Sequence, residues 1–230
     1  MPGFMIHMAH SMTTLEILEK KMDMDESFKE DFLLGTVIPD GIADKDISHF
    51  HGEEQAELIT KYPDFPKIMI KYRNKISTPY DLGILAHLYL DYIYVTEFWQ
   101  KYFDFYDEQG NIEYHTEKIS YVHIFNTDKR IPLTDFFSEK YFYGDYDRTN
   151  AYLKGLFQSR IPDVSGINRA AIHISECRDC DTTILEKYLT DLKGLAPAYG
   201  SPETAVFPYD ALVHFIMASS RDFIKQISMI

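Results

Sequence analysis

An apolar stretch near the middle of the chain carries two ionisable residues, and it constrains the fold more than any other feature. From Gly83 to Asp91 it reads Gly-Ile-Leu-Ala-His-Leu-Tyr-Leu-Asp, which we interpret as part of a buried helix. Residues four apart lie on the same face of an α-helix, so His87 and Asp91 are expected to point in the same direction. Because burying an unpaired charge costs several kcal/mol or more, this pair requires a partner.

Two kinds of partner satisfy such a pair. A divalent metal ion binds neutral imidazole and carboxylate together. Alternatively, His87 and Asp91 form a hydrogen bond with each other inside a packed core. The pair alone favours neither interpretation, so the choice depends on the rest of the chain.

The length and composition indicate a folded helical protein. The chain has 230 residues, of which 45% are hydrophobic and 15% aromatic, enough for one large domain or two small ones. No internal repeat, low-complexity tract or interdomain linker is evident. Helical patterns dominate, and we therefore expect one all-α domain over residues 1–230.

The charge balance restricts the partners. With 36 acidic and 23 basic residues the net charge is −13, which disfavours binding to nucleic acid polymers or anionic membranes, because both are approached through a positive field. A phosphate-containing substrate remains compatible if a local group, such as a metal ion, meets its charge. The sequence does not indicate an oligomeric state.

Cysteine usage and the N-terminus favour a cytoplasmic protein. The two cysteines, Cys177 and Cys180, provide no disulfide framework, and no basic region followed by a long apolar run marks a signal peptide. The most apolar window contains His87, Asp91 and Glu97, so it is better interpreted as a core helix than as a membrane span. We expect no stable membrane association.

Capping residues and helix breakers locate the other elements. Thr13 and Glu16 form a capping-box pattern, Pro39 and Gly41 interrupt any helix there, and a long central helix is predicted from the Thr78 cap to about residue 103. Residues 104–129 are ambiguous between an irregular excursion and a short hairpin. Further helices are predicted at about 25–34, 53–61, 66–74, 146–158, 182–192 and 209–227.

Additional histidines and an aspartate make a metal the more attractive partner. His7 lies near the start of the chain, Asp40 follows Pro39 on a turn, and His49 comes nine residues later. Zinc and related hydrolytic metals prefer this mixture of imidazole and carboxylate. Ligands from separate helices and loops are normal in helical metal enzymes. The candidate metal ligands are His7, Asp40, His49, His87 and Asp91.

The order of these motifs resembles a known family. It comprises an N-terminal His, Gly-x-x-x-Pro-Asp ending at Asp40, Ser-His-Phe around His49, and Leu-Gly-x-x-x-His-Leu-x-x-Asp ending at Asp91. This order resembles zinc-dependent phospholipase C and its nuclease relatives, and more closely the small bacterial cytoplasmic proteins similar to them. The segment Tyr-Gly-Asp-Tyr-Asp from Tyr143, leading to Asn150, is also similar, and the resemblance covers most of residues 1–160.

The resemblance implies an all-α fold around a metal cluster that hydrolyses phosphoester bonds. Asp40, His49, His87 and Asp91 match the ligands of one metal site, and His7 matches an N-terminal ligand. Members of that group hold three zinc ions with the help of an N-terminal Trp and a downstream His-x-x-x-Glu pair. This chain lacks both, so we expect one or two ions, zinc or another divalent metal.

The expected chemistry is metal-assisted hydrolysis of a small phosphate ester. A metal ion lowers the pKa of a bound water from about 15.7 towards about 7 and draws electron density from a phosphoryl oxygen. Asp40 could bind the metal through one oxygen and orient the water with the other. Asp40 and Asp91 are the candidate catalytic residues.

Alternatives remain for individual residues. His10 could replace His7, and His51 could replace His49, since only one of the two histidines that flank Phe50 is expected to face the metal. Glu97 is interpreted as a solvated or capping charge. A further set of residues either lies at the mouth of the site or caps a helix: Tyr143, Asp145 and Tyr146.

The His173-x-x-x-Cys177-x-x-Cys180 spacing could hold a structural zinc but lacks a fourth ligand, and it could also contain a redox pair. Ordinary reduced cysteines are the preferred interpretation. His214, on an apolar C-terminal helix, is interpreted as a core residue.

One rival function comes from a different class, and one related enzyme type is disfavoured. The chain could be a non-enzymatic helical binding protein in which the metal is structural or His87 and Asp91 simply pair in the core. A phosphohydrolase of the HD type requires adjacent His and Asp, which the chain does not contain. A catalytic metal site should keep an open position facing a cleft, whereas a structural site should be closed by protein atoms.

Overall fold

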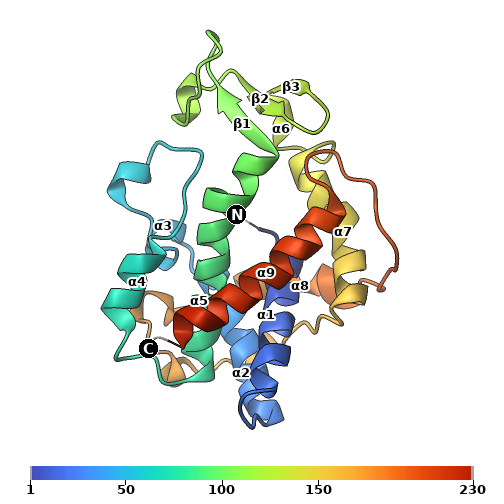
Figure 1. Cartoon of the computed structure of the whole chain (residues 1–230). Coiled ribbons are helices and arrows are strands. Elements are labelled where there is room, and N and C mark those ends of the chain that lie inside the picture. The colour runs from blue at the N-terminus through green and yellow to red at the C-terminus, as the bar shows by residue number, and fades with distance from the viewer. Residues whose placement is uncertain (1, 229–230) are drawn as a thin grey trace.

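Helix α5 (Pro79–Ile93) runs through the centre of the molecule and is surrounded by other helices (Figure 1). The computed structural model describes residues 2–228. As predicted, Thr78 caps α5 by accepting a hydrogen bond from the Asp81 backbone N–H, and Pro79 occupies the first helical position. The rest of the fold positions other elements around this helix.

Nine α-helices, three strands and several short helical turns make up residues 2–228. The remaining α-helices are α1 (Phe4–Glu19), α2 (Glu26–Val37), α3 (Lys45–Ser48), α4 (Phe65–Tyr72), α6 (Leu133–Phe136), α7 (Phe142–Leu156), α8 (Thr182–Gly194) and α9 (Tyr209–Ile227). The π-helix is η3 (Tyr94–Phe98). The 3-10 turns are η1 (Ile38–Gly41), η2 (Glu53–Gln55), η4 (Trp99–Lys101), η5 (Thr116–Lys118), η6 (Val164–Gly166), η7 (Arg169–Ala171) and η8 (Ser175–Cys177).

Helices α2 and α5 pack together more extensively than any other pair of elements. Two glycines make this close approach feasible. A Cβ atom on Gly83 would lie 2.1 Å from the carbonyl oxygen of Phe32, and one on Gly35 would lie 2.3 Å from that of Tyr80. The two backbones are therefore in direct contact at this crossing.

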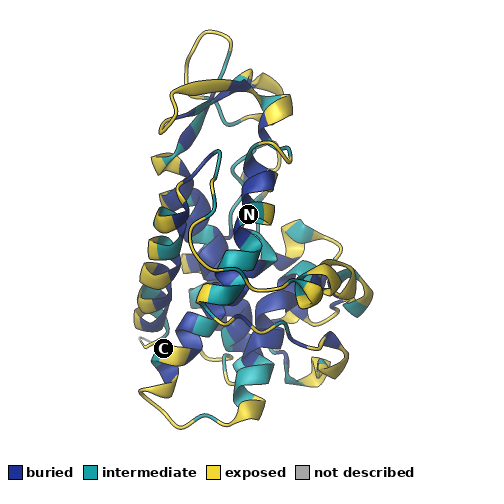
Figure 2. Ribbon diagram, turned by 90° about the vertical axis from the view of Figure 1, so that its right-hand side faces the viewer, coloured by how far each residue is buried: buried dark blue, intermediate teal, exposed yellow. Residues whose placement is uncertain are grey.

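Helix α1 is buried on almost all sides, between α9, α2, α7 and α5. Its apolar residues surround the helix rather than forming one stripe, as is typical of a helix inside a core. The predicted capping box is wrong, because α1 begins at Phe4 and Thr13 lies inside it, where its hydroxyl donates to the Ala9 carbonyl oxygen at 2.9 Å. Figure 2 shows the buried segments gathered in the middle of the molecule.

The expectation of an all-α fold is only partly right, since a small antiparallel sheet stands at one end of the molecule (Figure 1). Its order is β1 (Phe103–Tyr106), β2 (Tyr121–Ile124), β3 (Lys129–Pro132). Phe105 pairs with Val122, which pairs with Ile131, and all three side chains are buried. The alternation of buried and partly exposed residues resolves the ambiguous segment as a hairpin with a third strand.

Two predicted helices are shorter than expected. The central helix ends at Ile93 and continues as η3 and η4 to Lys101. The helix predicted at 53–61 is wrong beyond η2, because this segment bonds to a distant loop: the backbone N–H of Ile59 donates to the Tyr114 carbonyl, and that of Thr116 donates to the Glu57 carbonyl. Long-range pairing thus overrides the local helical preference.

The helices formed by residues 2–228 fall short of the length and apolar character that a membrane span requires.

Replacing Gly83 with alanine should destabilise the fold, because the added Cβ would clash with the Phe32 carbonyl oxygen. We expect a loss of about 2–3 kcal/mol in the free energy of unfolding, measured by urea denaturation. The matched control is Gly194→Ala at the end of α8, where a Cβ meets nothing within 4 Å. That change should alter stability by roughly 0.5 kcal/mol or less, and an equal effect of both variants would contradict the proposed helix contact.

Candidate metal centre

The five predicted ligands meet at one buried place. His7 comes from α1, Asp40 from η1, His49 from the residue after α3, and both His87 and Asp91 from α5. Two overlapping groups have ligand atoms within 4.8 Å of one another: His7 with His87 and Asp91, and Asp40 with His49 and His87. The fold therefore gathers into one cluster the residues that the sequence spreads over 85 positions.

Three of these side chains have the spacing of metal ligands. Asp91 Oδ2 lies 3.3 Å from His87 Nε2 and 3.4 Å from His49 Nε2, and the two nitrogens are 3.1 Å apart. Ligand atoms bound at roughly 2.0–2.1 Å in a tetrahedron are about 3.3–3.4 Å from one another. The triangle formed by His49, His87 and Asp91 therefore fits one divalent ion.

Asp40 lies at the edge of this triangle. Its Oδ1 is 3.7 Å from His49 Nε2, and its side chain is 14% exposed, whereas His49 and Asp91 are fully buried. Lys45 Nζ donates to the Asp40 backbone carbonyl at 2.5 Å and to its Oδ1 at 3.1 Å. Lys45 is a functional candidate that the sequence interpretation missed; the only signal was a lone basic residue five positions after Asp40.

His7 contacts the other oxygen of Asp91. His7 Nε2 is 3.4 Å from Asp91 Oδ1, and its ring stacks on that of His87 with 3.9 Å between centroids and 5° between planes. Within residues 2–228, neither ring nitrogen of His7 and neither carboxylate oxygen of Asp91 makes a hydrogen bond. Buried polar atoms without partners are costly, and metal binding would satisfy the Asp91 oxygens and one ring nitrogen of His7.

Backbone and hydroxyl contacts orient two of the imidazoles. His87 Nδ1 lies 2.8 Å from the Thr36 carbonyl oxygen, which can only accept, so Nδ1 carries the proton and Nε2 presents a lone pair to the cluster. His49 Nδ1 lies 2.9 Å from Ser48 Oγ. Metal-binding histidines typically have such a partner on their second nitrogen, because it sets the tautomer and the ring orientation.

The electrostatics of the cluster favour a neutral His49 and an ionised Asp91. Burial lowers the pKa of His49 to about 3. Burial alone would raise the pKa of Asp91, but His87 and His7 outweigh it and hold that pKa well below its ordinary value. Burial likewise would lower the pKa of His87, yet the adjacent Asp91 raises it. The Asp91 carboxylate is thus held in its ionised form, the form in which a carboxylate binds a metal ion.

The alternative ligands lie outside the cluster. His10 is buried against Phe223, with ring centroids 6.0 Å apart, and burial lowers its pKa to about 3. His51 Nδ1 bonds instead to Asp46 Oδ1 at 2.8 Å. His7 and His49 are therefore the members of each pair that join Asp91.

The cysteine motif forms no metal group in the described part of the chain. His173 Nδ1 is engaged by Asp81 Oδ2 at 2.8 Å. Cys177 and Cys180 are free and buried, and burial raises the pKa of the Cys177 thiol. Ordinary reduced cysteines are consistent with this arrangement.

Other expectations are corrected. His214, on α9, is exposed rather than part of the core. Tyr143 is 51% exposed, and no side chain caps α7. Asp145 is buried and accepts hydrogen bonds from the backbone N–H groups of Ala205 and Val206, so it anchors a distant loop. Tyr146 is partly buried, and burial raises its pKa, with a smaller contribution from the negative charge of Asp91.

Comparison of the chain with family models, with curated proteins and with solved structures finds no match. The resemblance to zinc-dependent phospholipase C therefore stays a prediction. What the structure supports is a mainly helical domain with a buried His and Asp cluster that could hold a metal ion.

Metal-free protein should bind zinc in a calorimetric titration. His87→Ala should weaken zinc binding at least about 100-fold, because it removes a direct ligand. Ser48→Ala should weaken it about 10-fold, since it removes only the partner that orients His49. His214→Ala, at an exposed histidine, should leave zinc affinity unchanged. Equal affinities in all four proteins would show that the cluster is not the zinc site.

Proposed function

We propose that this protein is a metal-dependent hydrolase of a small phosphate ester. The observation that carries the proposal is the metal-like spacing of His49, His87 and Asp91 together with a more accessible edge formed by Asp40 and Lys45. A bound divalent ion would supply Lewis-acid chemistry: activation of water and neutralisation of charge on a phosphoryl group. Zinc suits this nitrogen and oxygen donor set.

The substrate would approach along the Asp40 edge. The side chains of His7, His49, His87 and Asp91 are at most 2% exposed, whereas Asp40 is 14% and Lys45 is 36% exposed. An ammonium group has three N–H donors, and Lys45 uses two on Asp40. A third donor could therefore bind a phosphate oxygen and supply the local positive charge that this acidic chain otherwise lacks.

The two aspartates would have different roles. Asp40, at the accessible edge, can bind the ion through one oxygen and accept a proton from the attacking water with the other. Asp91 is completely buried, so we assign it to metal binding and to holding His7 and His87 in place. A direct catalytic role for Asp91 stays a prediction.

The geometry favours two ions rather than one. An imidazole binds a metal in the plane of its ring, and two parallel planes cannot both contain the same ion, yet the rings of His7 and His87 are parallel. The two oxygens of Asp91 also face different histidines. We therefore propose that Asp91 bridges a tight site at Asp40, His49 and His87 and a weaker site at His7.

His7→Ala should remove the weaker ion and retain the tighter one. Elemental analysis after equilibration with zinc should give two ions per chain for the original protein and one for the variant. His10→Ala, one turn away on α1, is the matched control and should keep both. Loss of both ions in His7→Ala, with the fold intact by circular dichroism, would contradict the two-site arrangement.

A structural metal is the second candidate function, and the deep burial of four of the five ligands favours it. Structural sites are closed by protein atoms, whereas catalytic sites keep an open position. The two candidates differ in what the metal does: a structural ion raises the melting temperature alone, whereas a catalytic ion also supports turnover.

The zinc- or manganese-loaded protein should hydrolyse bis(4-nitrophenyl) phosphate, and Lys45→Met should raise KM about tenfold with a smaller change in kcat, because Lys45 binds the phosphate in the ground state. Asp40→Asn should lower kcat at least about 100-fold. Lys67→Met, at a side chain that is 77% exposed, is the control and should change neither constant. A loaded, stabilised protein without turnover would favour the structural ion.

A further inference from the structure

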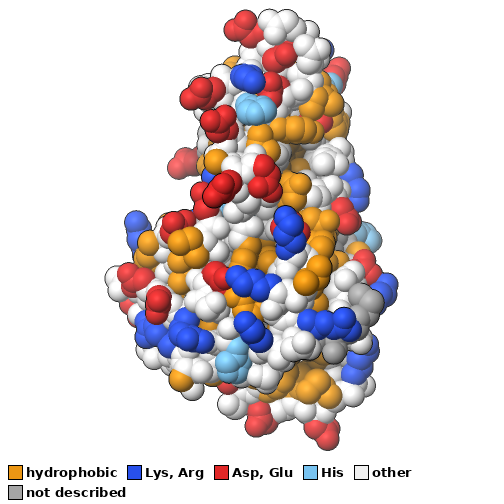
Figure 3. All heavy atoms as spheres, turned by 90° about the vertical axis from the view of Figure 1, so that its left-hand side faces the viewer, with side chains coloured by type: hydrophobic (Ala, Val, Ile, Leu, Met, Phe, Trp, Pro, Cys, Tyr) orange, Lys and Arg blue, Asp and Glu red, His pale blue; other side chains and the backbone are white. Residues whose placement is uncertain are grey.

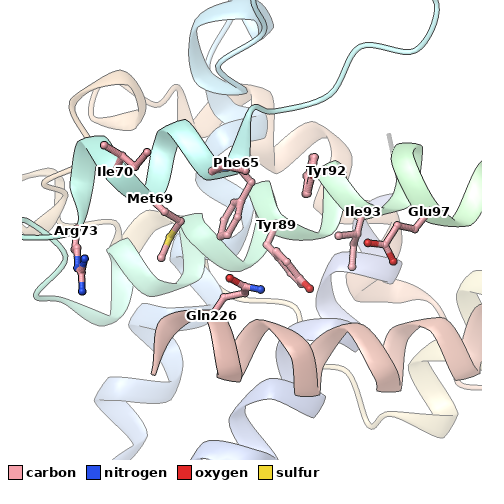
Figure 4. A pocket seen from close by; sticks show the side chains of 10 residues that line it. Phe65, Met69, Ile70, Arg73, Tyr89, Tyr92, Ile93, Glu97 and Gln226 are labelled. Atoms are coloured by element: carbon pink, nitrogen blue, oxygen red, sulfur yellow. The ribbon is translucent and has the colours of Figure 1, made fainter. Parts of the chain in front are cut away.

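Two cavities lie on the face of α5 that is turned away from the metal centre. Tyr89 stands between His87 and Asp91 in the sequence, about 200° around the helix from each. Two adjoining cavities of about 440 and 450 Å³ share Tyr89, Ile93 and Glu97 as lining residues. Together they form what we call the α5 groove, bordered by α4 and α9 (Figure 4).

One half of the groove is an aromatic and apolar wall. Phe65, Met69 and Tyr92 line the first cavity together with Tyr89. The rings of Phe65 and Tyr89 have centroids 5.0 Å apart, and Phe65 stacks near Tyr92 at 6.5 Å. Apolar side chains also reach the surface in patches on this side of the molecule (Figure 3). Small-molecule sites typically have this volume and a mostly apolar lining with a few polar groups.

Two polar groups without partners meet where the cavities join. Tyr89 is 7% exposed, and within residues 2–228 its hydroxyl makes no hydrogen bond. Glu97 forms no ion pair or hydrogen bond in the same part of the chain. Figure 4 shows the Tyr89 hydroxyl and the Glu97 carboxylate directed towards the same side of the pocket. Glu97 is exposed and both residues line the two cavities, so the carboxylate and the hydroxyl oxygen are available to a ligand that donates hydrogen bonds.

The neighbouring charges favour a positive ligand at this junction. Asp222 lines the second cavity, and its carboxylate and that of Glu97 both raise the pKa of Tyr89, after burial as the main cause. Asp222 is paired with Lys225 at 2.7 Å. The other cations lie away from the junction: Arg73 lines only the first cavity, and Lys101 only the second.

The backbone presents Glu97 in an unusual way. It belongs to the π-helix η3, which interrupts the regular helix directly after Ile93. Single π-helical turns are rare and occur frequently at functional sites. Glu97 is exposed, which agrees with the solvated charge predicted from the sequence, and it also lines both cavities.

We propose that the α5 groove binds an amphipathic organic amine. Its protonated nitrogen donates hydrogen bonds to the Glu97 carboxylate and the Tyr89 hydroxyl, and its apolar part lies against Phe65, Met69 and Tyr92. The ammonium gains a charge-assisted hydrogen bond from Glu97 and attraction to the tyrosine rings. A carboxylate of the same shape would be repelled by Glu97. This site is independent of the metal centre.

Three probes of equal shape test the proposal: 4-phenylbutylamine, 4-phenylbutanol and 4-phenylbutyrate, titrated at pH 7 and followed by NMR chemical shifts. We expect the amine to bind at least about tenfold more tightly than the carboxylate, with the alcohol in between. Glu97→Gln should weaken amine binding about tenfold and abolish this order. Tyr89→Phe, which removes only the hydroxyl, should weaken it about threefold.

Arg73→Gln is the matched control, because it changes a charge at the other end of the first cavity, and it should leave amine affinity unchanged within twofold. Equal affinities for the three probes, or an unaltered amine affinity in Glu97→Gln, would reduce the groove to a non-specific apolar surface and overturn the proposal. Tighter binding of the carboxylate that is lost in Arg73→Gln would reverse the assigned charge, and failure of all three probes to bind would exclude the site.

Discussion

The contact between α2 and α5 is the constraint on which the rest of this structure depends. Because Gly35 and Gly83 have no side chains, the two helix backbones touch where they cross. That contact brings the Thr36 carbonyl within hydrogen-bond distance of His87 Nδ1 and places η1, with Asp40, directly beside the polar face of α5. A bulkier residue at either glycine would separate the helices and displace both an orienting group and a candidate ligand.

The cluster contains buried polar atoms that have no hydrogen-bond partner among the described residues. His7, His49, His87 and Asp91 are buried, and both oxygens of Asp91 lack a hydrogen bond in the described residues. The facing nitrogen and oxygen atoms lie 3.1–3.4 Å apart. Divalent ions would hold these atoms together, because a metal takes lone pairs from several ligands at once. This is why a metal explains the arrangement better than a simple His–Asp pair in the core.

Helix α5 has two faces that differ in chemical character. His87 and Asp91 turn towards α1 and α2, whereas Tyr89 and Ile93 turn towards α4 and α9. The first face is polar and sealed, and the second is aromatic and open to the surface. One buried helix can support both because successive residues are about 100° apart around its axis. Glu97, four residues after Ile93 and within the π-helix, lines the same groove.

Much of the candidate site could be predicted from the chain. The i, i+4 spacing of His87 and Asp91 depends only on helix geometry, and the bounds of α9 and the Thr78 cap follow from local preferences and appear as expected. Other predictions failed where distant contacts decide the conformation. The helix expected at 53–61 is replaced by pairing with residues 114–116, and His214, expected in the core, is exposed.

By itself, the sequence determined a mainly helical protein with a polar pair on a buried helix and a set of metal-binding residue types. Tertiary structure alone decided that His7 rather than His10, and His49 rather than His51, face Asp91, that Lys45 reaches Asp40, and that Glu97 lines a groove. The physical reason is that periodicity specifies direction around one helix axis, whereas the meeting of side chains from different elements depends on how those elements pack.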